Sequence, residues 1–253
     1  MGAFRDALDD LLLGGRCVGC ERPGRLLCPF CRLALPSTAL PRWPTPTPPG
    51  LVVPFAPTDY DGVARAMVLG LKEHRMLALA RPLGSLLAAS VAAAVADVEG
   101  AVVLVPVPSR TSSVRQRGHD PTYTITRLAA RTLAAGGVDV VAARLLRLRP
   151  GVLDQAGLDA AERSANLRGS MTCPTAALRA LAVRRSRARV VVCDDVLTTG
   201  ATAREAQRAL EAVGLEVRAI AVAAATRKRL AGGEDQTHSE SSGVRVPPST
   251  GTH

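Results

Sequence analysis

The chain has 253 residues and a mass of 26.4 kDa, which at about 150 residues per domain predicts one full domain plus a smaller unit. Its hydrophobic fraction of 47% suffices for a buried core and excludes a wholly disordered chain. The net charge of +10 indicates either a polyanionic partner or a composition rich in arginine, and bulk charge alone does not separate the two.

The N-terminal segment lacks the signature of a secretory signal, because acidic residues interrupt it and no basic region precedes an apolar core. A short amphipathic stretch there places Phe4, Leu8, Leu11 and Leu12 at helical spacing. The longest apolar run, residues 86–96, is shorter than the roughly 18 residues that a spanning helix needs. We therefore expect a cytoplasmic protein with no membrane insertion.

Two CxxC pairs lie within the first 35 residues, at Cys17, Cys20, Cys28 and Cys31. Two such turns can complete a tetrahedral site of four sulfurs that suits Zn²⁺ and leaves no open position, so the metal would be structural. The alternatives are a pair of disulfides, which a cytoplasmic chain disfavours, and a thioredoxin-like motif, which lacks its fold context. The sequence thus predicts a zinc-knuckle module over residues 1–35. Cys173 and Cys193 stand apart in apolar surroundings and are expected to be buried non-ligands.

Three further segments follow the cysteine module. Residues 36–50 contain six prolines, which cannot propagate a helix or an interior strand, and are expected to form a linker or a wrapping segment. Residues 51–231 are expected to form the main domain. Residues 232–253 are polar and rich in turn-forming residues, which predicts a disordered tail.

Short valine-rich runs within the main domain predict strands at residues 101–108, 138–146, 188–194 and 216–225. These runs are nearly continuous rather than alternating, which is typical of strands buried on both faces. Helical patterns lie between them, including one over residues 202–213 that Gly214 would end. The order predicts an α/β fold with a mainly parallel sheet and helices on both faces, where ligands bind beyond the carboxyl ends of the strands.

The strongest functional pattern begins at the end of the third of these strands, where Cys193 is the last apolar residue. Two adjacent carboxylates, Asp194 and Asp195, can bind the vicinal hydroxyls of a ribose and lie near a hydrated Mg²⁺. A helix then begins, and its free N–H groups and dipole favour a phosphate; the residues at its start are Thr198, Thr199, Gly200, Ala201 and Thr202. A simple threonine cap with solvated acids is the alternative, which the order of strand, acids and helix disfavours.

Residues 190–202, VVVCDDVLTTGAT, resemble the phosphoribosyl pyrophosphate (PRPP) loop of the type I phosphoribosyltransferases. The surroundings resemble one branch of that superfamily, the ComF (competence protein F) family. The features that carry this resemblance are the CVGC and CPFC pairs, the stretch VPVPSRTSSVRQRG at residues 105–118, and Gln155 with Arg163 and Asn166.

The resemblance implies a type I phosphoribosyltransferase fold that binds PRPP or a related ribose 5-phosphate with Mg²⁺. Asp194 and Asp195 would hold the ribose hydroxyls and the metal, and residues 198–202 the 5′-phosphate. Lys72 would face the phosphates, Arg117 would belong to the family's Arg-Gly motif, and Arg163 would lie in a mobile cover over the site. The implied role is support of single-stranded DNA handling, together with the DNA-uptake machinery. The chain departs from the family at residues 119–121, where His-Asp-Pro replaces an aromatic residue, Asn and Gln.

Two observations bear on chemistry. Arg110, Arg115 and Arg117 follow a predicted strand, where they could bind pyrophosphate or simply form a solvated basic loop. Thr198 stands where purine-salvage members carry an acid, which removes the easiest candidate for a general base. The sequence therefore favours PRPP binding over turnover. The alternatives are an active phosphoribosyltransferase of nucleotide salvage and a nucleic-acid-binding module whose sugar-phosphate pocket acts as a switch.

Overall fold

The computed structural model of the chain describes residues 15–109, 114, 118–149, 169–185 and 188–226. The amphipathic stretch predicted near residues 4–12 and the predicted tail at residues 232–253 lie outside these described residues.

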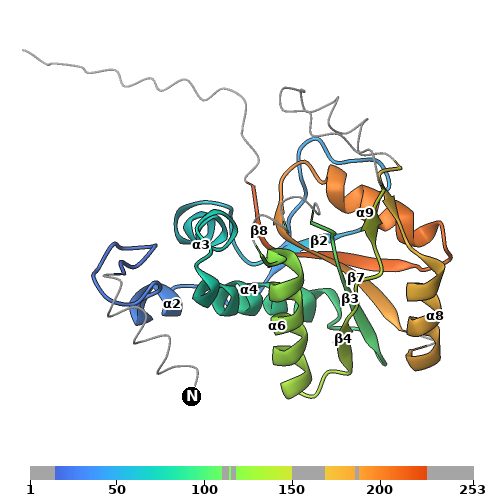
Figure 1. The fold of residues 1–253 in the computed structure, drawn as a ribbon, viewed down its shortest axis with the longest axis horizontal. Helices are drawn as coiled ribbons and strands as arrows, with labels where there is room; N and C mark the ends of the chain where they lie inside the picture. Colours follow the sequence, from blue (N-terminus) through green and yellow to red (C-terminus); the bar gives the residue numbers. More distant parts are fainter. Residues whose placement is uncertain (1–14, 110–113, 115–117, 150–168, 186–187, 227–253) are drawn as a thin grey trace, which may run out of the picture.

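The centre of the fold is a six-stranded sheet with the strand order β1-β2-β8-β7-β3-β4 (Figure 1). Its strands are β1 (Leu40–Pro41), β2 (Pro54–Ala56), β3 (Val102–Pro106), β4 (Val140–Ala142), β7 (Arg189–Leu197) and β8 (Val217–Ala225). Every neighbouring pair is parallel except β1 and β2. The predicted α/β fold with a mainly parallel sheet is confirmed. A separate antiparallel pair joins β5 (Arg147–Leu148) to β6 (Met171–Thr172).

Helices cover both faces of the sheet (Figure 1). One face carries α3 (Gly62–Glu73), α4 (Ala80–Ala94) and α6 (Pro121–Ala135), and the other carries α8 (Thr175–Arg184) and α9 (Ala201–Glu211). Successive residues of β3 alternate between the two cores, with Val102 and Leu104 in one and Val103 and Val105 in the other. The continuous valine runs therefore do mark strands buried on both faces.

Two strands differ by three residues or more from the bounds that the sequence predicts. The strand expected over residues 138–146 is only three residues long, because β4 lies at the edge of the sheet and pairs with β3 alone. The strand expected over residues 188–194 instead continues to Leu197, because β8 runs beside it and pairs Asp194 with Val222 and Leu197 with Ala225. The two aspartates thus lie inside a strand rather than after it.

The helix predicted over residues 202–213 is α9, which ends as expected. Gly214 adopts a left-handed conformation with φ of 82°, and the Leu215 amide donates a hydrogen bond to the Leu210 carbonyl at 3.1 Å. This is the bond that closes a Schellman motif, for which glycine is the usual residue. The local sequence was enough to predict it.

The cysteine segment packs directly on α3 (Figure 1). Its buried residues Cys17, Leu27 and Cys31 share one hydrophobic core with Met67 and Leu71 of α3. Short α2 (Pro29–Leu33) is capped at its N-terminus by Cys28, whose sulfur accepts a hydrogen bond from the Cys31 amide. A Cβ atom added at Gly19 would lie only 2.8 Å from Val63 Cγ2 of α3, so the module and the helix that carries Lys72 are in contact.

The proline-rich stretch also lies against the main domain. β1 pairs antiparallel with β2, with Leu40 opposite Ala56, so residues of this stretch extend the sheet by one edge strand. Further along, the carbonyls of Pro49 and Gly50 accept hydrogen bonds from side chains of α9. These contacts bring the stretch close to the start of α9.

Among the described residues, one stretch, Leu77–Ala94, is long and apolar enough to cross a membrane by length and composition. It comprises the 3-10 helix η1 (Leu77–Leu79) and α4, and 61% of it is buried inside the fold. Leu83, Leu86, Leu87 and Val91 are all at most 1% exposed. Such burial is typical of a helix in the core of a globular domain.

The strand order creates a switch point between β3 and β7. From β3 the chain moves outward to β4, and from β7 it moves in the opposite direction to β8. In sheets of this kind the crevice outside the carboxyl ends of the two central strands is the usual ligand site. Asp194 and Asp195 lie at this end of β7.

Candidate functional site

A cavity of about 400 Å³ lies at the carboxyl ends of β3 and β7. Five of its lining residues are ones that the sequence predicts: Lys72, Asp194, Asp195, Thr198 and Thr202. Between Thr198 and Thr202, Thr199 and Gly200 form the turn and Ala201 is the first residue of α9. The polar residues of the cavity that sequence reasoning missed are Tyr60, Ser109 and Thr122.

The aspartate pair is held by the backbone of its own strand. Asp194 Oδ1 accepts a hydrogen bond from the Asp195 amide at 2.8 Å, and Asp195 Oδ1 accepts one from the Val196 amide at 2.9 Å. The β3 ladder ends at the pair Pro106 and Cys193, one residue before Asp194. The aspartates therefore project beyond the end of the neighbouring strand, where a ligand can reach them.

Lys72 reaches the same place from the last turn of α3. Its ammonium group forms an ion pair with Asp195 Oδ2, and the Asp195 side chain is only 8% exposed. Burial alone would lower the pKa of Lys72, but the charges of Asp195 and Asp194 outweigh it and raise the pKa. Lys72 is therefore a cation at neutral pH, placed beside two acids.

The surroundings of Asp194 favour its neutral form, whereas those of Lys72 favour the charged form. Burial and the neighbouring charge of Asp195 raise its pKa well above the usual value of 3.8, although the charge of Lys72 opposes this shift. Two adjacent carboxyl groups with one lysine leave the site short of positive charge. Such a site favours a cation, and carboxylate oxygens are the ligands that Mg²⁺ prefers.

The turn before α9 presents backbone donors. Gly200 has φ of 75°, which permits the sharp change of direction, and the first helical bond runs from the Arg204 amide to the Gly200 carbonyl at 2.9 Å. Within the described part of the chain, the amides of Thr202 and Ala203 have no acceptor, as is usual at a helix start. Unpaired amides at the positive end of a helix dipole favour an anion.

The opposite wall is the start of α6, which Asp120 caps. Asp120 Oδ1 accepts hydrogen bonds from the Tyr123 amide at 3.1 Å and from the Ser109 hydroxyl at 3.0 Å. The Arg144 guanidinium lies 3.7 Å from the centre of the Tyr123 ring and 3.4 Å from Asp120 Oδ2. Asp120 and Pro121 thus supply a capping acid and a proline at the first helical position, a signal that could have been recognised in the sequence.

Several predicted residues cannot be placed in this cavity. Arg117 and Arg163, with Arg110, Arg115, Gln155 and Asn166, lie outside the described residues. Cys173 and Cys193 are buried, as expected.

Nothing in the local sequence indicates that Tyr60 and Thr122 line the cavity, because each residue reaches it only through the packing of a different element.

A larger cavity, of about 910 Å³, lies between α8 and residues 141–145 beside the sheet edge. It is lined mainly by alanine, valine and leucine, and none of the predicted site residues borders it. We place the candidate site in the smaller cavity because that is where the acids, the lysine and the helix start converge.

The four N-terminal cysteines form a separate cluster in which all sulfur atoms lie within 4.8 Å of one another. No disulfide links them, and the sulfurs of Cys20 and Cys28 are 3.6 Å apart. A tetrahedral site with Zn–S bonds of about 2.3 Å has sulfur–sulfur edges of about 3.8 Å. The cluster therefore fits a tetrahedral zinc ion, in agreement with the predicted ligand set.

Burial and hydrogen bonds shift the pKa values of Cys17 and Cys31 in opposite directions. Burial raises the pKa of Cys31 to about 12, together with its sulfur neighbours. Burial also acts to raise the pKa of Cys17, but hydrogen bonds from backbone amides, that of Cys28 first, outweigh it and lower the value to about 6. A bound zinc ion would supply the charge that four thiolates at this spacing need.

Comparison of the sequence with models of known protein families gives no match, and comparison with curated proteins gives none either.

Proposed function

We propose that the cavity at the carboxyl ends of β3 and β7 binds PRPP or a related ribose 5-phosphate together with Mg²⁺. The observation that carries this proposal is the convergence, in one cavity, of an acid pair, a lysine and the start of a helix. The three come from elements far apart in the chain. A phosphorylated sugar needs all three kinds of contact, for its hydroxyls, its metal-bound phosphates and its terminal phosphate.

Each group has a role in this proposal. The amides and hydroxyls of residues 198–202 bind the 5′-phosphate, and Asp194 binds the ribose hydroxyls. Lys72 and the two aspartates face the pyrophosphate end, where Mg²⁺ would be held by the carboxylates and would neutralise the phosphate charge. Because Lys72 already pairs with Asp195, this aspartate exchanges or shares its partner when the metal and the ligand arrive.

The same proposal takes the fold to be that of a type I phosphoribosyltransferase preceded by a structural zinc site at Cys17, Cys20, Cys28 and Cys31. Support comes from the switch point between β3 and β7 and from the spacing of the four sulfurs. Arg117 and Arg163, which lie outside the described residues, would complete the pyrophosphate end and the cover of the site.

We favour binding over turnover. Among the described residues, the acids that line the cavity are Asp194 and Asp195, and Asp195 is paired with Lys72. Thr198 cannot take a proton from an incoming base at neutral pH. A salvage phosphoribosyltransferase, the alternative, would have to rely on positioning and on charge stabilisation alone.

The cellular role that we propose is support of single-stranded DNA handling during DNA uptake, in contact with the uptake machinery. Its support is the resemblance of the sequence motifs and the net charge of +10, which favours a polyanion. In this proposal DNA is a second ligand, distinct from the sugar phosphate.

Calorimetric titration tests the proposal. PRPP with Mg²⁺ is titrated into the wild-type protein and into the double variant Asp194→Asn/Asp195→Asn, with single-stranded DNA as a second ligand. We expect Mg²⁺-dependent PRPP binding that the double variant loses, and DNA binding by the wild-type protein that weakens as the salt concentration rises. Wild-type protein that fails to bind PRPP would refute the proposal.

Pyrophosphate release across a panel of bases separates binding from turnover. Rapid release with one base would show that the protein is an active transferase. DNA binding that is unchanged in the double variant and insensitive to PRPP would favour an independent nucleic-acid function. The conservative change to asparagine keeps the side-chain volume, so a folded variant is expected.

A further inference from the structure

We propose that residues 44–51, called the strap here, hold the turn at Gly200 in its phosphate-binding shape, and that Gln207 is the positioning residue that fixes the strap. This inference rests on the proposed function, because it concerns the same phosphate site. It adds a part that the sequence motif does not contain, since the strap lies about 150 residues away from the turn in the chain.

The strap contacts the turn itself. A Cβ atom added at Gly200 would lie 3.0 Å from Pro44 Cγ, 3.2 Å from Leu51 Cδ2 and 3.3 Å from Pro48 Cδ. Gly200 is buried, whereas Thr198 and Thr199 beside it are exposed. One side of the turn is thus covered by apolar atoms of the strap, and the other side remains open to a ligand.

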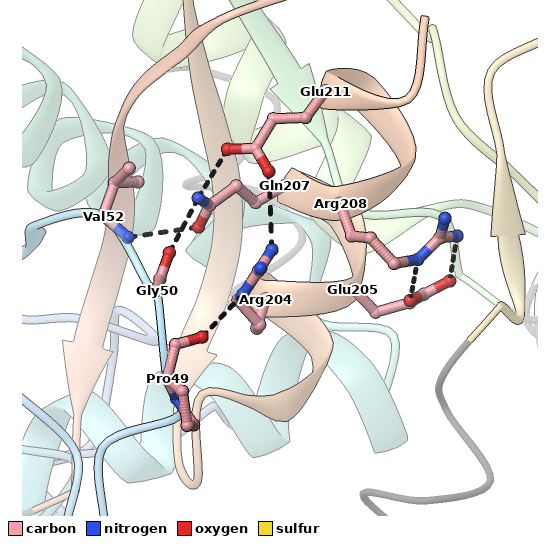
Figure 2. A network of polar contacts seen from close by, with 8 residues as sticks. All are labelled: Pro49, Gly50, Val52, Arg204, Glu205, Gln207, Arg208 and Glu211. Carbon is pink, nitrogen blue, oxygen red and sulfur yellow. Dashed lines mark hydrogen bonds and ion pairs between the residues drawn. The ribbon is translucent and has the colours of Figure 1, made fainter.

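Gln207 connects the strap to the helix that follows the turn (Figure 2). Its side chain is buried, with the residue 2% exposed. The amide nitrogen donates to the Gly50 carbonyl at 2.9 Å and to Glu211 Oε1 at 2.7 Å, and the amide oxygen accepts from the Val52 amide at 3.1 Å. All three bonds are good in length. One of them holds the backbone of the strap at Gly50, and another holds Val52, the residue that directly follows the strap.

Arg204 reinforces the same face of α9. Its Nε donates to the Pro49 carbonyl at 2.9 Å, and its guanidinium lies 3.5 Å from a carboxylate oxygen of Glu211 (Figure 2). Arg204, Gln207 and Glu211 occupy one face of the helix, at spacings of three and four residues. The helix therefore binds the strap, and the strap in turn packs on the turn that starts the helix.

This arrangement suits a site that binds phosphate through backbone amides. Such amides must point in fixed directions, and any freedom of the turn in the unbound protein weakens binding. The strap contains Pro44, Pro46, Pro48 and Pro49, whose rings restrict the backbone before any ligand arrives. A stiff strap that Gln207 holds would keep the turn in one conformation.

The opposite flank of α9 offers a matched control. Glu205 is 4% exposed, accepts a hydrogen bond from the Met171 amide at 2.9 Å and pairs with Arg208 at 2.7 Å (Figure 2). It is as buried and as well bonded as Gln207, but its partners belong to β6 and to α9 itself. Its loss should lower the stability of the helix without releasing the strap.

The experiment compares Gln207→Leu with Glu205→Leu. In the ligand-free proteins, hydrogen exchange is measured at the amides of residues 198–203, and calorimetry with Mg²⁺ gives the affinity for ribose 5-phosphate. We expect Gln207→Leu to speed exchange at these amides and to weaken binding by about tenfold, which corresponds to about 1.4 kcal/mol. Glu205→Leu should leave both properties close to those of the wild type.

A spectroscopic signal follows the strap directly. Trp43, the only tryptophan in the sequence, is 46% exposed and immediately precedes Pro44. Ribose 5-phosphate should change its fluorescence in the wild type and in Glu205→Leu but not in Gln207→Leu. If Gln207→Leu fails to fold, Pro48→Ala should produce smaller changes of the same sign, since it removes ring atoms from the contact with Gly200.

The outcomes are separable. Equal exchange at residues 198–203 in the two α9 variants, or in Pro48→Ala and the wild type, would overturn the inference whether or not the sugar phosphate binds. Wild-type protein that does not bind ribose 5-phosphate, but shows faster exchange at these residues in Gln207→Leu, would refute the proposed function and leave the strap as a support of the turn.

Discussion

The ammonium group of Lys72 and Oδ2 of Asp195 form an ion pair that joins the last turn of α3 to β7 across the candidate site. Asp195 is nearly buried, so removal of its partner would leave a carboxylate with little access to water. We expect Lys72→Met to lower the free energy of unfolding by about 1–3 kcal/mol. Chemical denaturation of the ligand-free protein measures this change.

A double-mutant cycle separates the ion pair from other effects of the substitution. Lys72→Met should cost much less in the background of Asp195→Asn, because the carboxylate that needs a partner is then absent. Equal costs in both backgrounds would show that the pair contributes nothing to stability.

Asp194→Asn should stabilise the ligand-free protein while it abolishes binding of the sugar phosphate with Mg²⁺. Burial and the charge of Asp195 raise the pKa of Asp194, so the ionised form is unfavourable in the folded state. Sites built for a ligand commonly carry such a cost, and its removal raises stability by about 0.5–2 kcal/mol. Thermal unfolding at pH 7 without ligand tests the first part, and calorimetry the second.

The raised pKa of Asp194 also predicts how the stability of the protein changes with pH. Because the folded-state pKa of Asp194 lies above the usual 3.8, the folded protein holds a proton that the unfolded chain has released. The contribution of Asp194 to stability is therefore complete below about pH 3.8 and decreases as the pH rises through the folded-state pKa. Asp194→Asn should remove this part of the decrease, and a variant whose stability curve keeps the wild-type shape would contradict the assignment.

The parts of the site that could be predicted consist of residues that are adjacent in the sequence. The acids and the turn occupy residues 194–202, and Gly214 ends the helix that follows through bonds to residues at most five positions away. The strand that carries the acids was predicted too short, because the additional pairs come from β8, whose length is decided elsewhere. Local pattern alone carries no information about such a partner.

The parts that could not be predicted depend on contacts between distant segments. Gln207 and Gly50 are separated by 157 positions, and nothing near either residue indicates the other. Tyr60 and Ser109 reach the cavity because β2 and β3 lie on either side of the two longest strands in the sheet order. An unremarkable glutamine within a helix pattern becomes informative only when its buried amide is seen to be fully bonded.

Zinc should hold the N-terminal module together. Over its described residues, 15–35, the segment contributes three buried core residues, Cys17, Leu27 and Cys31, and two of these are proposed ligands. We expect one zinc ion per chain in purified wild-type protein and little in Cys20→Ser. Removal of zinc with a chelator should increase hydrogen exchange over residues 15–35, because so small a module has almost no other source of stability.

Cys173→Ser is the matched control for the zinc measurement. Cys173 is buried in the other hydrophobic core and lies outside the four-sulfur cluster, so its replacement should leave the zinc content unchanged. Wild-type protein without zinc, or Cys20→Ser protein with a full equivalent, would contradict the proposed ligand set.

Gly200→Ala and Gly214→Ala distinguish backbone strain from contact with the strap. The two glycines have similar left-handed conformations, with φ of 75° and 82°, and they lie just before and just after α9. At Gly214 an added Cβ meets no atom within 4 Å, so alanine should cost about 1–2 kcal/mol from backbone strain alone. At Gly200 the same strain adds to a contact of 3.0 Å between the added Cβ and Pro44. This contact should lower the free energy of unfolding by about 1 kcal/mol more. Denaturation of the two variants gives the difference, and Trp43 fluorescence should change in Gly200→Ala only. Equal losses in the free energy of unfolding would show that the strap moves away from the added methyl group and does not hold the turn in place.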